Sequence, residues 1–278
     1  MLVICSISLR YRKVRDGCAS FCFDAGALAA LVHSGEQRDG QIMYTEAALY
    51  DLIYTQMVDH NAETEKVVEL VRRARPNCRT LLDVACGTGE HVRLLGEVYG
   101  FEVDGLDLSP EMIARARAKY PRGRFDIADM TDFHLGRCYD GVLCMFGSIG
   151  HALTLPGLRK TLACMRDHVA PGGLVVVLPY RTPEAIEVGT DEYTAESGGV
   201  RVVRTRRSER DGQRHRVSFH FNVEGPDGTW EADEVHELGL FTVDDMLAAF
   251  SDVGLAVTFD PTWDELGNRG VYVATVQI

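Results

Sequence analysis

The order of apolar segments between Thr80 and Leu178 restricts the fold of this chain more than any other feature. Short runs that suit buried strands alternate there with longer runs whose apolar residues recur at helical spacing. The predicted strands are Thr80–Ala85, Glu102–Asp107, Arg124–Ala128, Tyr139–Met145 and Gly173–Leu178, and the predicted helices are Glu90–Tyr99, Pro110–Lys119 and Gly157–His168. Such alternation builds a parallel sheet with helices on both faces. We therefore predict an α/β fold with a doubly wound sheet.

Beyond Pro179 the pattern changes to strands that alternate apolar and polar residues, separated by turns at Asp211-Gly212 and at residues 226–228. These strands are Val200–Ser208, Arg214–Val223 and Thr229–Leu240. A helix at Thr242–Phe250 and two strands at Leu255–Phe259 and Gly270–Val276 follow them. We predict an inserted antiparallel β-sheet over about residues 180–240 that forms a substrate wall, and a closing antiparallel hairpin on the main sheet.

Residues 1–42 show no periodicity that links them to a core. Two interpretations stay open for this segment: a disordered arm or upstream start ahead of Met43, and a lid or partner-binding arm. Helical spacing begins just after Tyr44 and continues in two helices that end before Pro76. We therefore predict an N-terminal extension over 1–42 and one domain over 43–278 that contains the inserted sheet.

Composition excludes several classes of protein. The chain has 278 residues, 46% of them hydrophobic, which is enough for a sizeable core. Its net charge of −12 argues against binding to nucleic acid or to anionic membranes, since both need a positive face. Its eight cysteines show no C-x-x-C or metal-ligand spacing, so we predict neither a disulfide framework nor a metal site. A cytoplasmic enzyme is the expectation.

The most informative stretch is a buried strand that runs into a Gly-x-Gly turn at Gly87–Gly89 and then into a helix. Asp83 lies at the carboxyl end of this strand, where it can meet a cation, and Asp107 ends the next strand, where it can bind both hydroxyls of a ribose. An acid facing the loop disfavours a pyrophosphate, and Val92 replaces the small residue of a dinucleotide fingerprint. This chemistry favours S-adenosylmethionine (SAM) over NAD.

Several stretches in the order of the chain carry a family resemblance. They are LLDVACGTGEH (81–91), GLDLSPEM (105–112), Asp129-Met130-Thr131-Asp132-Phe133, MFGSIGHA (145–152), the APGG turn (170–173), VHELGLFT (235–242) and Asn268-Arg269-Gly270. Together they resemble class I SAM-dependent methyltransferases. Within that family they are most similar to the bacterial N,N-dimethyltransferases that act on nucleotide-linked amino sugars. The resemblance covers roughly residues 43–278 and implies a Rossmann-like methyltransferase sheet.

The resemblance implies a set of cofactor contacts. Asp83 and Gly87 would serve the methionine moiety, Asp107 the ribose, and Asp129 with Met130 the adenine. The full predicted set is Tyr50, Asp83, Ala85, Cys86, Gly87, Gly89, Asp107, Leu108, Met112, Asp129, Met130 and Met145. Two of these keep a plain alternative: Asp129 as an ordinary exposed acid and Met145 as a core residue.

Two residues are candidates for catalysis. Methyl transfer mainly needs alignment of the nucleophile and exclusion of water, but an ammonium acceptor must first lose a proton. His151 follows the fourth strand, where ligands bind in open α/β sheets, and matches the histidine of the family's GHL motif. Tyr44 matches a family tyrosine that closes over the active site. Their alternatives are a histidine that only supports neighbouring groups and an aromatic that packs a helix.

The substrate region departs from the family. The family's Pro-Trp-Trp stretch is here Pro179-Tyr180-Arg181, its RVSHS-like strand is residues 204–208 with added arginines, and a family serine is replaced by Gly147. Because arginine forks bind phosphate or carboxylate, we predict substrate contacts from Tyr180, Arg207 and Arg269. A solvated face is expected for most of the remaining arginines of this region, which are Arg201, Arg204, Arg210, Arg214 and Arg216.

We therefore predict a SAM-dependent methyltransferase that N-methylates a small amine, such as a nucleotide-linked amino sugar in natural-product biosynthesis, and releases S-adenosylhomocysteine. The expected partner is a small-molecule acceptor, without nucleic acid or membrane, and a homodimer stays open. Two alternatives remain: an O- or C-methyltransferase acting on another small natural-product intermediate, and a SAM-binding regulator without turnover.

Overall fold

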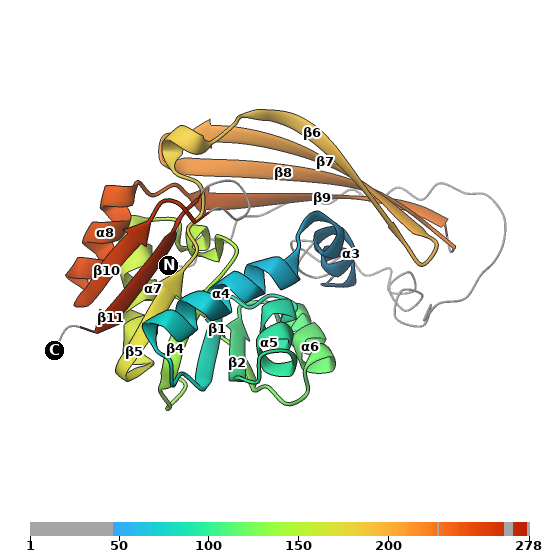
Figure 1. Cartoon of the computed structure of the whole chain (residues 1–278). Helices are drawn as coiled ribbons and strands as arrows, with labels where there is room; N and C mark the ends of the chain where they lie inside the picture. Colours follow the sequence, from blue (N-terminus) through green and yellow to red (C-terminus); the bar gives the residue numbers. More distant parts are fainter. Residues whose placement is uncertain (1–46, 227, 264–268, 277–278) are drawn as a thin grey trace. The chain divides into compact units, whose positions relative to one another are not determined.

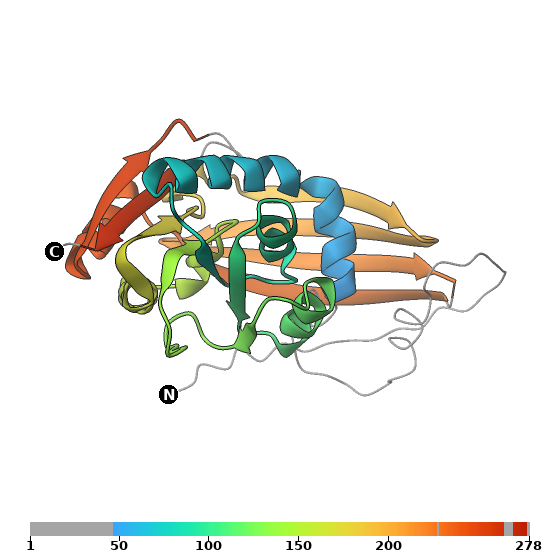
Figure 2. The ribbon, with the colours of Figure 1, turned by 60° about the horizontal axis from the view of Figure 1, so that its bottom comes forward.

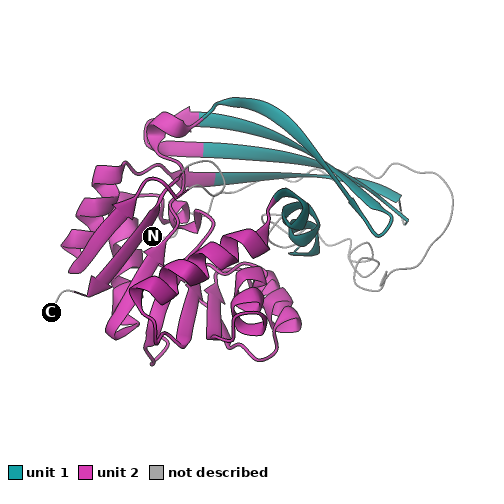
Figure 3. Ribbon diagram, in the orientation of Figure 1, with its two compact units in different colours: residues 1–57, 187–209, 216–236 teal, residues 58–186, 210–215, 237–278 magenta. Residues whose placement is uncertain are grey.

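The computed structural model describes residues 47–226, 228–263 and 269–276. The predicted extension 1–42 and Tyr44 lie outside the described residues. The chain divides into two compact units (Figure 3). Among the described residues, unit 1 consists of 47–57, 187–209 and 216–236, and unit 2 of 58–186, 210–215 and 237–276. Within the described ranges, no helix is long and apolar enough to cross a membrane.

Unit 2 is built on a seven-stranded sheet with the order β10-β11-β5-β4-β1-β2-β3 (Figure 1). Its strands are β1 (Thr80–Val84), β2 (Glu102–Asp107), β3 (Phe125–Ile127), β4 (Tyr139–Cys144), β5 (Val169–Val177), β10 (Leu255–Asp260) and β11 (Val271–Val276). The five strands from β1 to β5 pair in parallel, whereas β11 pairs antiparallel with both β5 and β10. The predicted doubly wound sheet with a closing hairpin is confirmed.

Two buried clusters lie on the two faces of this sheet because neighbouring strand residues point in opposite directions. In β1, Leu81 belongs to one cluster and Leu82 to the other. The helices of unit 2 are α4 (His60–Ala74), α5 (Glu90–Glu97), α6 (Pro110–Lys119), α7 (Leu155–Asp167) and α8 (Val243–Asp252). Side chains of α4, α5 and α6 join the Leu81 cluster, and those of α7 and α8 join the Leu82 cluster. Figure 2 shows α4 and α5 on the same side of the sheet.

The glycine turn is held by the helix that follows the next strand. Gly89 has a φ of +75°, and a Cβ at this position would lie 2.8 Å from the Cβ of Ala116 on α6. Helix α6 itself begins as the sequence predicts, with Ser109 as N-cap accepting from the Met112 N–H and Pro110 in the first position. The turn therefore needs glycine both for its backbone conformation and for its contact with α6.

Among its described residues, unit 1 contains a four-stranded antiparallel sheet with the order β6-β7-β8-β9 and the helix α3. Its elements are α3 (Ala47–Met57), β6 (Gly189–Ser197), β7 (Val200–Asp211), β8 (Arg214–Gly225) and β9 (Gly228–Gly239), the last three of which run on into unit 2. The inserted sheet is confirmed, but β6 was not predicted. It is an edge strand in which only Ala195 is buried, so it lacks an apolar alternation that a sequence pattern could detect.

The contact between Gly89 and α6 predicts different costs for two glycine substitutions. Gly100 has a φ of +76° and no neighbour within 4 Å of an added Cβ, so Gly100→Ala tests the backbone conformation alone. We expect Gly100→Ala to lower the free energy of unfolding by about 1 kcal/mol, and Gly89→Ala by roughly 2–4 kcal/mol, since it adds a clash. Urea unfolding followed by circular dichroism measures both. If both variants lost the same free energy of unfolding, the contact between Gly89 and α6 would make no contribution to stability.

Candidate functional site

The loop after β1 has an unusual backbone that brings main-chain groups to the surface of the sheet edge. Ala85, Gly87 and Gly89 all have positive φ, at 59°, 56° and 75°. Gly89 is the N-cap of α5 and supplies no side chain to the helix start. A Cβ on Gly87 would meet nothing within 4 Å, so open space adjoins the loop at this point. The loop therefore exposes backbone to a ligand at the carboxyl end of β1.

Asp107 fastens this loop to the loop after β2. One carboxylate oxygen accepts a hydrogen bond from the Gly87 N–H at 2.9 Å, and the other accepts from the Ser109 N–H at 2.9 Å. Burial raises the pKa of Asp107, although these backbone donors oppose the change. Beside it, burial also raises the pKa of the Cys86 thiol well above its usual range, so Cys86 is a neutral packing residue at neutral pH.

Asp83 is the least satisfied charged group of the site. It is 1% exposed, and neither of its carboxylate oxygens has a hydrogen-bond partner among the described residues. Burial raises the pKa of Asp83 to about 7, and the nearby His91 only partly counteracts this rise. A buried carboxylate without donors is costly, so the position favours either a proton or a cationic ligand.

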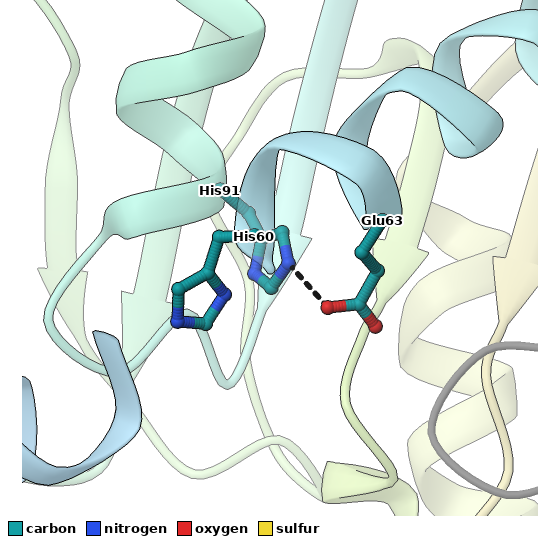
Figure 4. Close-up of side chains that lie close together, drawn as sticks. All are labelled: His60, Glu63 and His91. Atoms are coloured by element: carbon teal, nitrogen blue, oxygen red, sulfur yellow. Dashed lines mark hydrogen bonds and ion pairs between the residues drawn. The ribbon is translucent and has the colours of Figure 1, made fainter. Parts of the chain in front are cut away.

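Glu63 and His91, which were not among the predicted site residues, form an ion pair (Figure 4). The charges of both residues act on Asp83. His91 Nε2 lies 3.0 Å from one carboxylate oxygen of the fully buried Glu63, whose other oxygen has no hydrogen-bond partner within the described part of the chain. Burial alone would lower the pKa of His91, but the hydrogen bond and charge of Glu63 outweigh it, and the pKa is raised. His91 is therefore the cation of this pair.

His60 completes the group as a neutral side chain. Its ring meets the His91 ring edge-on, with 5.1 Å between centroids. Burial and the charge of His91 lower the pKa of His60 to about 4, so it carries no proton charge at neutral pH. Two buried carboxylates, one imidazolium and one neutral imidazole thus leave an excess of negative charge when Asp83 is ionised.

The donor set of His60, Glu63 and His91 also invites comparison with a zinc site. The three ligand atoms lie within 4.8 Å of one another. Ligands around a tetrahedral zinc ion lie roughly 3.3 Å apart, given metal–ligand distances of about 2.0–2.1 Å. Because Glu63 and His91 already bond each other directly, a hydrogen-bonded charge pair describes the group better.

A signal for Glu63 was present in the sequence. Helix α4 buries Val67, Leu70 and Val71, and Glu63 precedes them at the spacing that places it on the same apolar face. An acid at such a position is either paired or functional. His91 lies inside the glycine-loop stretch, but its partner Glu63 is 28 positions away, so no local motif pairs the two residues.

The residues predicted to bind adenine and the methionine chain occupy varied environments. Asp129 is exposed and accepts hydrogen bonds from the N–H and hydroxyl of Thr131, while Met130 is buried. Met112 and Met145 are buried, and Leu108 is exposed. Met145 packs in the cluster that contains Leu81, so its alternative as a core residue stays open. The cofactor roles of these residues stay predictions.

His151 and the predicted substrate residues of unit 2 lie around the turn that follows β4. His151 is exposed in a short 3-10 helix (Ser148–Ala152) that begins after Gly147. Arg269 stacks on Tyr180, with its guanidinium carbon 5.8 Å from the ring centroid. A small hollow, partly open to solvent, is lined by residues that include Glu63, Phe146, Gly147, Trp263 and Arg269. This hollow brings a buried acid and an arginine to the same space.

Other predicted residues lie in unit 1. The Arg207 side chain is 69% exposed and pairs with Glu209 at 2.6 Å, and the Tyr50 ring packs on Tyr54 with 4.4 Å between centroids. Their predicted roles stay predictions. The expectation of a solvated Arg204 is wrong: it is 4% exposed and lies over aromatic rings, of which the Phe219 centroid is 5.1 Å away. Strand alternation puts Arg204 on the buried face of β7.

These observations fit a cofactor that carries both a cationic amino-acid end and a ribose. The orphaned oxygens of Asp83 and Glu63 suit an ammonium group, and Asp107 stands at the end of β2 where ribose hydroxyls bind in this type of sheet. SAM has both features, whereas a pyrophosphate would face the excess of buried acids.

Comparisons with known proteins agree with this chemistry. Residues 81–173 match the family model of a methyltransferase domain. The chain is 40% identical over 236 residues to dTDP-3-amino-3,6-dideoxy-alpha-D-glucopyranose N,N-dimethyltransferase of Streptomyces fradiae, covering 83% of this chain and 92% of that protein. It is 37% identical over 216 residues to dTDP-3-amino-3,4,6-trideoxy-alpha-D-glucopyranose N,N-dimethyltransferase of Streptomyces venezuelae, covering 77% of this chain and 91% of that protein.

Solved structures agree as well. The crystal structure of Streptomyces venezuelae DesVI matches with a TM-score of 0.77 and 36% identity, covering 84% of this chain and 98% of that one. The SAM-bound structure of CalS10, an amino pentose methyltransferase from Micromonospora echinaspora, matches with a TM-score of 0.70 and 31% identity, covering 93% and 99%. The chain therefore belongs to the class I SAM-dependent methyltransferases, in the group that contains the sugar N,N-dimethyltransferases, and SAM is its cofactor.

Proposed function

We propose that this enzyme transfers methyl groups to the amino nitrogen of a nucleotide-linked amino sugar. The observation that carries the proposal is the 40% identity over 92% of the length of a relative named for that reaction. A second observation supports the proposal. Arg269 lines the hollow beside the turn that carries His151, and an arginine fork suits the phosphates of such an acceptor.

The cofactor contacts follow from charge. Asp83 and Glu63 bind the α-ammonium group of SAM, Asp107 binds the ribose hydroxyls, and Asp129 with Met130 adjoins the adenine. The unpartnered oxygens of the first two acids support this assignment, since a buried carboxylate gains most from an ammonium donor. When bound, SAM supplies a methyl group that is already activated by the positive sulfur.

The chain's task is then to present the acceptor as a free amine. His151 accepts the proton that the acceptor ammonium must lose. The freed nitrogen lone pair could then take the methyl group that bound SAM would supply, with S-adenosylhomocysteine as the product. The exposed position of His151 in the turn after β4 supports this role, because a solvated imidazole can exchange its proton after each turnover.

Radiolabelled methyl transfer tests the proposal directly. The enzyme is incubated with methyl-labelled SAM and with paired acceptors, each amino sugar in a nucleotide-linked and a free form, beside hydroxyl-bearing analogues that lack the amine. Label on the amine of the nucleotide-linked sugar is expected. Transfer to the hydroxyl analogues at equal rate would refute N-methylation.

Asp83→Asn is expected to raise the stability of the cofactor-free enzyme and to lower its affinity for SAM. The pKa of Asp83 is about 7 in the folded chain, whereas the ordinary value for an aspartate is 3.8. Between these two pH values the folded state holds a proton that the unfolded state lacks, so the free energy of unfolding falls as pH rises. Asparagine does not titrate, so the variant lacks this pH dependence of stability. At pH 8 its free energy of unfolding should exceed that of the wild type by a few kcal/mol, because each unit of pKa shift corresponds to roughly 1.4 kcal/mol. The dissociation constant of SAM rises about 10–100-fold.

The control for this prediction is Asp140→Asn, measured by the same thermal and urea unfolding and by calorimetry with SAM. Asp140 accepts hydrogen bonds from the N–H groups of Arg79 and Thr80 and pairs with Arg75, and despite partial burial its pKa is lowered. Its replacement should therefore destabilise the enzyme at neutral pH and leave SAM binding unchanged. An Asp83→Asn variant that loses stability and keeps its SAM affinity would contradict the assignment.

His151→Ala tests the base. Turnover at pH 7 should fall about 10–100-fold, because a positioned base contributes roughly 10²–10⁴-fold and solvent replaces part of it. The rate of the variant should then rise with pH more steeply than the wild-type rate, because the acceptor amine must lose its proton to solvent. The SAM dissociation constant serves as the control and stays unchanged. Full turnover across neutral pH would remove the assignment.

A further inference from the structure

We propose that Tyr180 and His215 form a positioning pair that holds Arg269 for the anionic part of the acceptor. The inference rests on the proposed function and deepens it, by naming which residues of this chain recognise the acceptor's phosphate. The juxtaposition that carries it lies wholly within unit 2 and joins residues 35 positions and more apart in the sequence.

The first observation is a hydrogen bond that fixes the Tyr180 ring. The Tyr180 hydroxyl lies 2.8 Å from Nδ1 of His215, and the two rings are stacked with centroids 5.8 Å apart. His215, at the start of β8, is buried, whereas Tyr180 follows β5 and is half-buried. A buried imidazole bonded to the phenol restricts the tyrosine to one orientation, because another rotamer would leave the bond unmade.

The second observation is the contact between Tyr180 and the arginine. The Arg269 guanidinium carbon lies 5.8 Å from the Tyr180 ring centroid, within the range of a cation–π contact. An arginine that lies on a ring has its fork oriented before a ligand arrives, so less side-chain freedom is lost on binding. The ring that His215 holds is thus the surface on which Arg269 rests.

The third observation is the missing side chain at Gly147. A Cβ there would lie 3.0 Å from Nη1 of Arg269 and 3.1 Å from a ring carbon of Tyr180, so both side chains lie directly against the backbone of this turn. Gly150 is similar, since its Cβ would lie 3.1 Å from Cβ of Tyr180. His151 is the next residue. Tyr180 therefore contacts both the arginine and the turn that carries the proposed base.

The arrangement links two requirements of the acceptor. Arg269 binds a phosphate group bidentately, while the amine must reach the turn of His151. Because Tyr180 packs on both, it sets the separation between anion and amine that an acceptor must match. Tyr180 stands where the resembled family has a tryptophan. Tyrosine keeps the aromatic face and adds the hydroxyl that His215 bonds.

Two kinds of variant separate the parts of the pair. Tyr180→Phe keeps the ring and removes the hydrogen bond, and His215→Leu removes the same bond from the other side. Arg269→Lys keeps the charge but loses the planar fork. If the pair acts as a unit, the double variant Tyr180→Phe/His215→Leu is no worse than either single variant. Thermal unfolding of each variant verifies that the fold is intact.

The first measurement is calorimetric titration with thymidine diphosphate, which requires no turnover. Wild-type enzyme should bind it. Tyr180→Phe and His215→Leu should each raise the dissociation constant of thymidine diphosphate about tenfold, and Arg269→Lys should raise it more than tenfold. The affinity for SAM should stay unchanged in all three variants. No binding by the wild type, equal binding by wild type and Tyr180→Phe, or a parallel loss of SAM affinity would each overturn the inference.

The second measurement separates this inference from the proposed function. With a nucleotide-linked amino sugar, Tyr180→Phe should raise KM about tenfold and change kcat little, while kcat/KM for the free amino sugar falls by a much smaller factor. Equal losses on both acceptors would indicate a merely structural role and overturn the inference. Absence of methyl transfer to either acceptor by the wild type, together with diphosphate binding that Tyr180→Phe weakens, would refute the proposed function and keep the anion site.

Discussion

The charge of Asp83 is the constraint around which the active-site half of unit 2 is arranged. A carboxylate at the end of a buried strand, with no donor to either oxygen among the described residues, lowers the stability of the cofactor-free enzyme. Glu63 adds a second buried acid, and His91 neutralises only one of the two. The site thus retains an excess of negative charge when Asp83 is ionised.

The loop after β1 owes its shape mainly to its backbone conformation and to close packing. Positive φ at Gly87 and Gly89 turns the chain, and the clasp of Asp107 on the Gly87 and Ser109 N–H groups joins two neighbouring loops. The close approach of Gly89 to Ala116 adds helix α6 to the same assembly. The two loops are therefore held together by direct contacts.

Much of this could be predicted from local pattern. Strand–helix alternation, the turn at Gly87–Gly89 and the acids ending β1 and β2 depend on neighbouring residues alone, and the parallel sheet and the cofactor follow from them. Strand β6 could not be predicted, because an edge strand with one buried residue has no apolar period. Arg204 was placed wrongly because its charge suggested solvent, whereas the alternation of β7 turns it inward.

The sequence by itself therefore determined the class of fold, the glycine loop and a cofactor with positive charge, since periodicity and turn chemistry act within a few residues. Only the tertiary structure decided which distant groups meet: Glu63 with His91 across 28 positions, and Tyr180 with His215 across 35. Such pairs depend on the order of strands in the sheet and on which face each helix covers. No local pattern encodes them, because the apolar face around Glu63 indicates that the acid needs a partner but does not say which residue supplies it.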